Sequence, residues 1–134
     1  MSILVTDAGF APAPERQIPA LADFGPEDTA VDLSNTDDPT ALEADFDRIT
    51  LIRVAFPAFS DGRAFTIGRR LRMLGYKGQL FAHGHVISDQ YAMCRRVGFD
   101  GVEISEELAA RQPADQWQFR ADWKAHDYQS RLRA

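Results

Sequence analysis

The chain alternates between short apolar runs and longer segments in which apolar residues recur every three or four positions. Four strands are predicted by the apolar runs at residues 30–34, 49–56, 79–82 and 102–104. Helices are predicted by helical spacing at residues 40–47, 62–75 and 87–97, and from residue 106 onward. Because strands and helices alternate, the pattern predicts an α/β fold with a small, mostly parallel sheet of about four strands in βα succession.

The run at residues 49–56 is almost continuously apolar and rich in β-branched residues. Such a run suits a strand that is covered on both faces, as strands of parallel sheets are. Arg53 interrupts it. A charged side chain is costly to bury alone, so we expect Arg53 to reach a sheet edge, a strand end or a buried partner.

A short motif occurs twice, each time between a predicted helix and a predicted strand. Residues 75–78 and residues 98–101 both follow the pattern Gly-aromatic-charged-Gly. The first glycine can adopt the left-handed conformation that ends a helix, and the aromatic side chain can fill the seam between helix and sheet. The repeat favours successive helix-to-strand units.

The two ends of the chain differ from this central part. Residues 1–29 begin with an apolar run and then contain four prolines, which predicts a short N-terminal strand or hairpin followed by an extended segment. Residues 30–134 are expected to form a single α/β domain with a C-terminal helical segment. The aromatic residues of that segment either cover the sheet or dock onto another protein. They are Trp117, Phe119, Trp123 and Tyr128.

Two architectures fit the predicted order of elements. The strands can form an open sheet with helices packed on it, or a partial barrel. A partial barrel leaves apolar edges exposed, which would favour a homodimer. We expect the open sheet.

Composition excludes several classes of protein. The 134 residues carry a net charge of −5, whereas a nucleic-acid-binding protein needs a basic face for phosphate contacts. One cysteine, Cys94, excludes an intramolecular disulfide and a multi-cysteine metal site, and it falls on a predicted apolar helix face as a core residue. No apolar run approaches the length of a membrane span, and the N-terminus does not resemble a signal peptide, so we expect a cytoplasmic protein.

Familiar cofactor motifs are missing from the sequence. It has no GxGxxG, no Walker loop, no GxSxG and no CxxC motif. We therefore expect no resident cofactor. Candidate chemistry has to be sought at the carboxyl ends of the strands, because loops and helix N-termini meet there in a parallel sheet.

The sharpest local motif is Asp61-Gly62-Arg63, after the second predicted strand. Gly62 allows a tight turn, the amides of a helix start favour anions, and Arg63 can add a two-pronged donor. The motif would suit sulfite, sulfate or phosphate. Alternatively, Asp61 caps the helix and Arg63 pairs with a neighbouring carboxylate.

A second candidate is His83-Gly84-His85 after the third predicted strand, with Asp89 nearby and Glu103 at the end of the fourth. His83 and Asp89 are the candidates for proton transfer. Two histidines lack the third and fourth ligands that zinc needs, so we predict no metal site. The alternative is that these are exposed loop histidines.

Four ordered motifs resemble the bacterial family called domain of unknown function 934. They are the segments at residues 56–66, 75–80, 84–90 and 96–100, and the similarity extends to residues 37–39 and 128–129. Residues that match the family's motifs are Phe56, Pro57, Phe59, Asp61, Gly62, Arg63, Arg69, Tyr76, Gly78, Gly84, Asp89, Gln90, Arg96, Gly98 and Asp100. The sequence departs from the family at Phe81, His85 and Val97, where Arg, Asp and Cys are common.

The resemblance implies an accessory protein of assimilatory sulfate or sulfite reduction. Its expected partner is sulfite reductase or another sulfate-assimilation enzyme, which it would serve without catalysis or by aiding electron delivery. The alternative is a small oxidoreductase-type enzyme that acts on a small oxyanion at the carboxyl rim of the sheet. There, Asp61, Gly62, Arg63, Arg69, Gln90 and Arg96 are the anion-binding or motif residues, and His83 or Asp89 would pass the proton.

Overall fold

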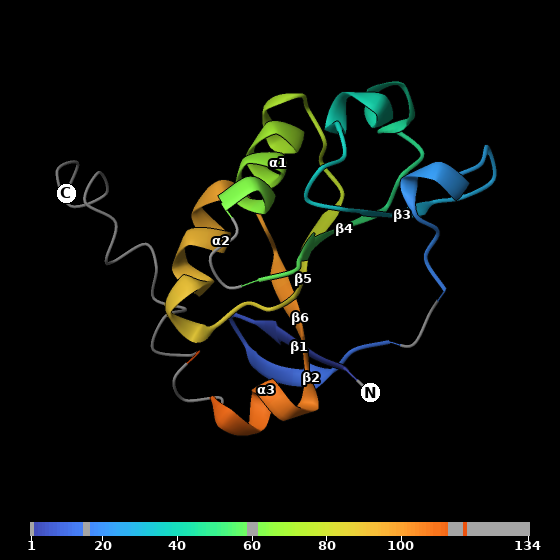
Figure 1. Ribbon diagram of the computed structural model, residues 1–134. Coiled ribbons are helices and arrows are strands. Elements are labelled where there is room, and N and C mark those ends of the chain that lie inside the picture. Colours follow the sequence, from blue (N-terminus) through green and yellow to red (C-terminus); the bar gives the residue numbers. More distant parts are fainter. Residues whose placement is uncertain (1, 15–16, 59–61, 113–116, 118–134) are drawn as a thin grey trace, which may run out of the picture.

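The computed structural model describes residues 2–14, 17–58, 62–112 and 117. Their strands form one open sheet in the order β2-β1-β6-β5-β4-β3 (Figure 1). The strands are β1 (Ser2–Thr6), β2 (Gly9–Pro12), β3 (Ala30–Leu33), β4 (Leu51–Phe56), β5 (Gln79–Gly84) and β6 (Gly101–Ser105). The N-terminal hairpin adds β1 and β2 to the four predicted strands, so the described sheet has six strands instead of about four.

Six short helices connect and flank the strands of the described chain. They are the 3-10 helices η1 (Leu21–Asp23), η2 (Pro39–Asp45) and η3 (Ser88–Gln90), and the α-helices α1 (Gly62–Met73), α2 (Tyr91–Val97) and α3 (Glu106–Arg111). The helix predicted at residues 40–47 is the 3-10 helix η2, which Asp38 caps by accepting a hydrogen bond from the Thr40 amide at 3.0 Å. Its apolar face is narrow, with Leu42 buried and Phe46 only partly buried, so little packing sustains a regular α-helix.

Strand direction follows the predicted succession. β3, β4, β5 and β6 are parallel neighbours in chain order, whereas β1 pairs antiparallel with both β6 and β2. Right-handed connections between strands in sequential order all cross the same face of a sheet. Accordingly, α1 and α2 lie side by side over one face, and α3 packs against β1 and β6 (Figure 1).

The hydrophobic core fills the space between the sheet and the helices α1 and α2. On β4, Ile52, Val54 and Phe56 are buried in this core together with Ile67 and Leu71 of α1. Side chains alternate between the two faces of a strand. The residues between the core positions therefore lie on the opposite face, which α1 and α2 leave uncovered.

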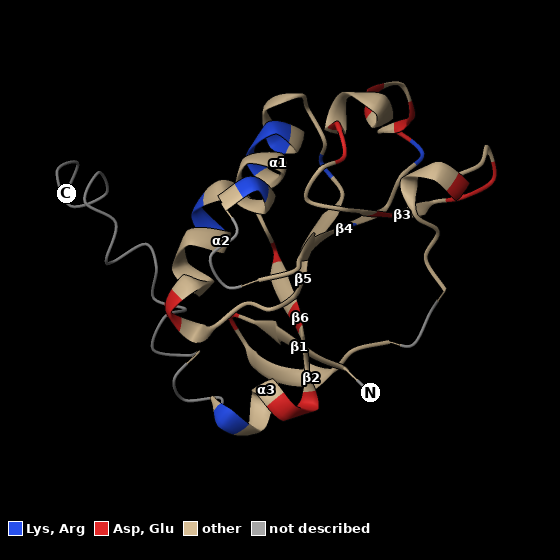
Figure 2. Ribbon diagram, in the orientation of Figure 1, with Lys and Arg blue, Asp and Glu red and all other residues tan. Residues whose placement is uncertain are grey.

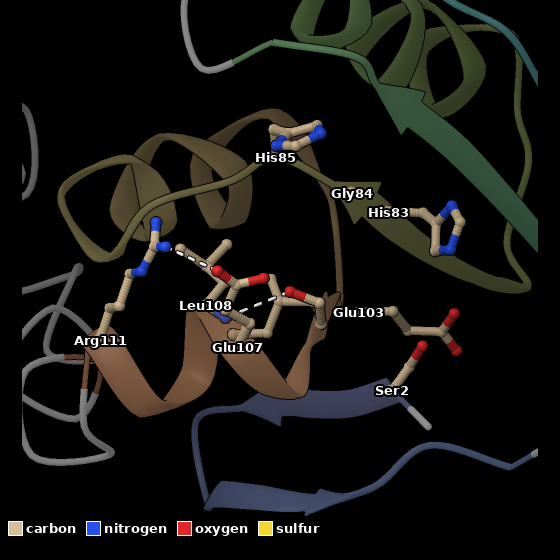
Figure 3. A pocket seen from close by; sticks show the side chains of 10 residues that line it. Ser2, His83, Gly84, His85, Glu103, Glu107, Leu108 and Arg111 are labelled. Atoms are coloured by element: carbon tan, nitrogen blue, oxygen red, sulfur yellow. Dashed lines mark hydrogen bonds and ion pairs between the residues drawn. The ribbon is translucent and has the colours of Figure 1, made fainter.

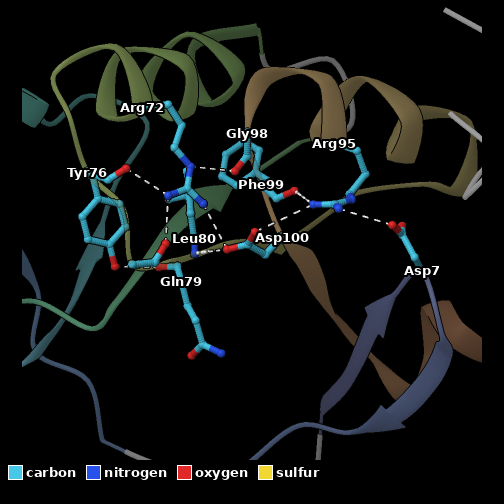
Figure 4. Close-up of polar contacts among 10 residues, drawn as sticks. Asp7, Arg72, Tyr76, Gln79, Leu80, Arg95, Gly98, Phe99 and Asp100 are labelled. Carbon is cyan, nitrogen blue, oxygen red and sulfur yellow. Dashed lines mark hydrogen bonds and ion pairs between the residues drawn. The ribbon is translucent and has the colours of Figure 1, made fainter. Parts of the chain in front are cut away.

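The repeated Gly-aromatic-charged-Gly motif forms two joints that a single side chain links. Gly75 and Gly98 have positive φ angles of 107° and 115°, and Tyr76 is buried, as predicted. Arg72 donates to the carbonyls of Gly98, Tyr76 and Gly78 at 2.9, 3.1 and 2.8 Å, and pairs with Asp100 at 3.0 Å (Figure 4). These motif residues thus hold the ends of α1 and α2 against the starts of β5 and β6.

One residue of the predicted C-terminal helical segment lies in the described chain. Trp117 is buried, contacts the rings of Phe10 and Tyr91 edge-on, and donates from Nε1 to the Gln112 carbonyl at 2.8 Å. Trp117 thus packs against its own domain, which is the first of the two alternatives for this segment, rather than against another protein. Residues 113–116 and 118–134, with the other predicted aromatic contacts, lie outside the described residues. Among the helices that the structure describes, none has the length and apolarity that a bilayer crossing requires.

Candidate functional site

A network of charged side chains spans the uncovered face of the sheet from β3 to β6. Arg53 Nε and Nη2 donate to the two carboxylate oxygens of Asp32 on β3 at 2.7 and 2.6 Å. Arg53 Nη1 donates to Glu103 Oε2 on β6 at 2.6 Å. The hydrogen bonds that Arg53 donates to Asp32 are the largest cause of its raised pKa, so the guanidinium stays charged. Arg53 therefore reaches two carboxylate partners.

Glu103 is the most deeply buried member of this network. Only 2% of it is exposed, whereas the Asp32 side chain is 32% exposed. A buried carboxylate is stable only with a charged or hydrogen-bonding partner, which Arg53 supplies at one oxygen. Among the described residues, none donates a hydrogen bond to the other oxygen, Oε1.

His83 lies beside Glu103, because β5 and β6 pair these two positions in register. Burial lowers the pKa of His83, and the positive charge of Arg53 lowers it further. The carboxylates of Glu103 and Asp32 act in the opposite direction but do not compensate. His83 is consequently a neutral imidazole at neutral pH, with one nitrogen that donates and one that accepts a hydrogen bond.

These groups line a pocket of about 260 Å³ between the sheet and α3 (Figure 3). Its lining residues are Ser2, His83, Gly84, His85, Glu103, Ile104, Ser105, Glu107, Leu108 and Arg111. In Figure 3 the side chains of Ser2, His83 and Glu103 lie together at one end, and Arg111 and Glu107 form an ion pair of 2.6 Å on α3. A partly enclosed pocket with a few polar groups is the usual form of a small-molecule site.

The structure brings together only part of the predicted site. His83 and Glu103 share the pocket, but Arg63 and Asp89 are not among its described lining residues. Gly62 is the first residue of α1, and Arg63 is exposed on its first turn. Asp61 lies outside the described residues, so its role as a helix cap or anion ligand stays a prediction.

The remaining motif residues lie on α1, on α2 and on the turn before α2, and are not among the described residues that line the pocket. Asp89 is exposed on η3, and Gln90 accepts a hydrogen bond from the Ile87 amide at 3.1 Å, which closes the turn before α2. Arg69 on α1 and Arg96 on α2 are exposed. Gln90 thus has a structural role here, in line with helix capping.

The helices α1 and α2 carry a concentration of arginine. Together they hold six arginines and no aspartate or glutamate, and their blue segments are adjacent in Figure 2. Arg72 and Arg95 are partly buried and paired with Asp100, and Arg63, Arg69, Arg70 and Arg96 are exposed, Arg70 at 3.8 Å from Asp38. Met73 on α1 and Met93 on α2 are also exposed, by 74% and 47%. We call these four exposed arginines and two methionines the arginine face.

The sequence made predictions about Cys94 and about metal ligands, and both concern residues that the structure describes. Cys94 is buried, and burial raises its pKa to about 12, so it is the core residue that its position on an apolar helix face predicts. Within the described part of the chain, no group of three or more His, Cys, Asp or Glu side chains is arranged to hold a metal ion.

Sequence reasoning missed three members of the pocket and its network. Asp32 and Arg53 are separated by twenty residues in the sequence and meet only because β3 and β4 pair them in register. Ser2 reaches the pocket because β1 pairs with β6. The one available signal was the charge of Arg53 within an apolar strand, which predicted that its side chain reaches a sheet edge, a strand end or a buried partner.

No curated protein and no solved structure shows significant similarity to the chain. One family, described as bacterial protein of unknown function (DUF934), matches residues 30–134. This match covers the parallel strands β3 to β6 with their helices, and therefore both the charged network and the arginine face. The chain belongs to this family, domain of unknown function 934, as the four ordered motifs predicted.

Proposed function

We propose that the protein is an accessory protein of assimilatory sulfate or sulfite reduction. It acts as a partner of sulfite reductase or of another enzyme of that route, without catalysing a reaction itself or by aiding electron delivery. The resemblance of its motifs suggests the route. The arginine face is the observation that supports a partner role.

The arginine face has the composition of an interface between proteins. Arginine and methionine are enriched at such interfaces, whereas aspartate, glutamate and lysine are depleted there. α1 and α2 contain six arginines and lack all three depleted residue types, although the whole chain has a net charge of −5. A local positive surface on an acidic protein suits a partner with an acidic surface patch.

Charge complementarity of this kind acts mainly on the rate and orientation of association. Positive and negative patches steer the encounter, and salt screens the attraction between exposed charges. The two exposed methionines supply adaptable apolar contact at the same face. We therefore expect association that weakens as the salt concentration rises.

The alternative, an enzyme that acts on a small oxyanion, has less support from the geometry. An oxyanion requires uncommitted positive charge, but the guanidinium groups of Arg53 and Arg111 are both bound to carboxylates. Glu103 and Glu107 add negative charge to the same pocket. The predicted anion ligand Arg63 does not line this pocket.

The decisive experiment measures binding of the purified chain to purified sulfite reductase and phosphoadenylylsulfate reductase by surface plasmon resonance at low and high salt. The double variant Arg69→Glu and Arg96→Glu reverses two exposed charges for which no ion pair is seen among the described residues. We expect it to weaken binding at least tenfold, chiefly through a slower association rate.

Arg111→Glu is the matched control. It makes the same substitution at an exposed arginine on α3, away from α1 and α2 (Figure 2), and should leave binding to the partner within about twofold, a difference of less than 1 kcal/mol. The proposal is wrong if neither enzyme binds the wild-type chain at low salt, or if the double variant binds as tightly as the wild type.

A further inference from the structure

The pocket between the sheet and α3 has properties that the partner role does not use. It lies at the carboxyl ends of β5 and β6 and is lined by residues of β1, β5, β6 and α3 and by His85 after β5, none of which belongs to the arginine face. From its geometry, we propose that this pocket binds a small molecule that carries a primary ammonium group. This inference is independent of the partner function.

The first reason is the state of the Glu103 carboxylate. Its Oε2 atom is held by Arg53 at 2.6 Å, and no described residue donates to Oε1. The residue is 2% exposed and lines the pocket. Because Glu103 lines the pocket, its Oε1 atom can accept a hydrogen bond from a ligand there, and a ligand that donates one is preferred over a ligand that cannot.

The second reason is the charge balance around the pocket. Among the described residues, the carboxylates of Glu103 and Glu107 and the guanidinium of Arg111 line the pocket, and the pair of Arg53 and Asp32 next to Glu103 adds one charge of each sign. Three negative charges against two positive charges leave one negative charge. Because the pocket is partly desolvated, this charge favours a monovalent cation and repels an anion.

The third reason is the number of acceptors at one end of the pocket. An ammonium group has three N–H donors and no acceptor. The free oxygen of Glu103, the hydroxyl of Ser2 and the accepting nitrogen of His83 provide three acceptors in the same region (Figure 3). The lowered pKa of His83 supports this assignment, since a neutral imidazole keeps a lone pair for the ligand.

The rest of the pocket determines the size of the ligand. A volume of about 260 Å³ far exceeds the roughly 10–15 Å³ of cavity that one water molecule requires, so a substituent fits beside the ammonium group. Ile104 and Leu108 give that part an apolar wall. The ligand class is consequently a small aliphatic amine rather than an ammonium ion alone.

The test is a titration of the isotopically labelled full chain followed by NMR amide shifts at constant pH and ionic strength. The probes are ethanolamine, ethylene glycol, which replaces the ammonium group by a hydroxyl, and sodium sulfite. We expect saturable shifts at Ser2, Gly84 and Leu108 with ethanolamine at millimolar affinity, and at least tenfold weaker binding of the other two probes.

Three variants assign the binding to the proposed groups. Glu103→Gln should weaken ethanolamine binding at least tenfold, whereas Glu106→Gln, at an exposed glutamate of α3 that is not among the lining residues, should leave it within threefold. Ser2→Phe fills the pocket without touching the pair of Glu103 and Arg53, so it should abolish binding even if Glu103→Gln does not fold.

Several results would overturn the proposal. They are no saturable shift with ethanolamine, equal affinity for ethylene glycol or sulfite, shifts confined to residues outside the pocket, and full binding by folded Glu103→Gln or by Ser2→Phe. Each can occur whether or not sulfite reductase binds the chain, so this inference and the partner function fail separately.

Discussion

Replacing Arg53 with methionine should destabilise the protein more than any other single change on the uncovered face of the sheet. Methionine preserves much of the side-chain volume but leaves the carboxylate of Glu103, which is 2% exposed, without its partner. Removing one member of a buried ion pair costs about 3–5 kcal/mol. The Asp32 side chain is 32% exposed and can be rehydrated, so its share of the loss is small.

A second substitution distinguishes the stability that is lost through the unpaired charge of Glu103 from the stability that is lost through poorer packing. In the double variant Arg53→Met and Glu103→Gln, the buried group is neutral, and we expect at least about 2 kcal/mol of the lost stability to return. Arg111→Met is the control for arginine removal, because its ion pair with Glu107 is 72% and 76% exposed. It should cost less than about 1 kcal/mol.

Urea unfolding followed by tryptophan fluorescence and circular dichroism measures these differences, provided that the slopes agree between variants. A loss below about 1 kcal/mol for Arg53→Met would show that the network contributes no more than an exposed pair. Equal stability of the single and double variants would show that the Glu103 charge is not the origin of the loss.

Three further predictions concern other parts of the molecule. Gly68→Ala places a methyl group 2.5 Å from the Phe99 ring. The variant should be less stable than the wild type, because overpacking costs about 1–3 kcal/mol and the gain in helix propensity is about 1 kcal/mol. Gly62→Ala, where nothing lies within 4 Å of the added methyl group, is the control in the same urea assay. Because the folded-state pKa of His83 lies below the ordinary 6.5, wild-type stability should fall relative to His83→Gln as the pH drops below that value, and parallel pH profiles would contradict this. Cys94 should react with a thiol reagent only in denaturant, since burial raises its pKa to about 12, and rapid reaction in buffer would disprove its burial.

The order of strands and helices could be predicted from local pattern, and the reasons are visible in particular residues. Apolar runs marked β3 to β6, and Gly75 and Gly98 marked the ends of α1 and α2 through conformations that glycine adopts most easily. The joint residues Tyr76 and Phe99 were expected in the seam and are buried there. Strand positions, helix ends and these joints can be predicted from the sequence, because they depend mainly on residues that are close together in it.

The candidate site could be predicted only in part, because it depends on long-range register. The positions of the strand ends predicted that Arg63, His83 and Asp89 lie together at the carboxyl edge of the sheet. That prediction did not include the face of the sheet on which each side chain lies. Alternation along β5 places His83 on the face opposite Ala82, which belongs to the core under the helices. The pairing of Asp32 with Arg53 depends on how β3 and β4 align, and no local pattern encodes that alignment.

The pairing of β1 with β6 also has a consequence for synthesis on the ribosome. Ser2 lies opposite Ser105, so β1, which leaves the exit tunnel before β6, cannot pair with β6 until that strand has followed. β1 and β2 can close their hairpin early, but the remaining edge of β1 stays open to wrong pairing during that interval. A nascent chain halted before Gly101 would carry this open edge, which makes the wait for β6 the vulnerable stage in the biogenesis of the fold.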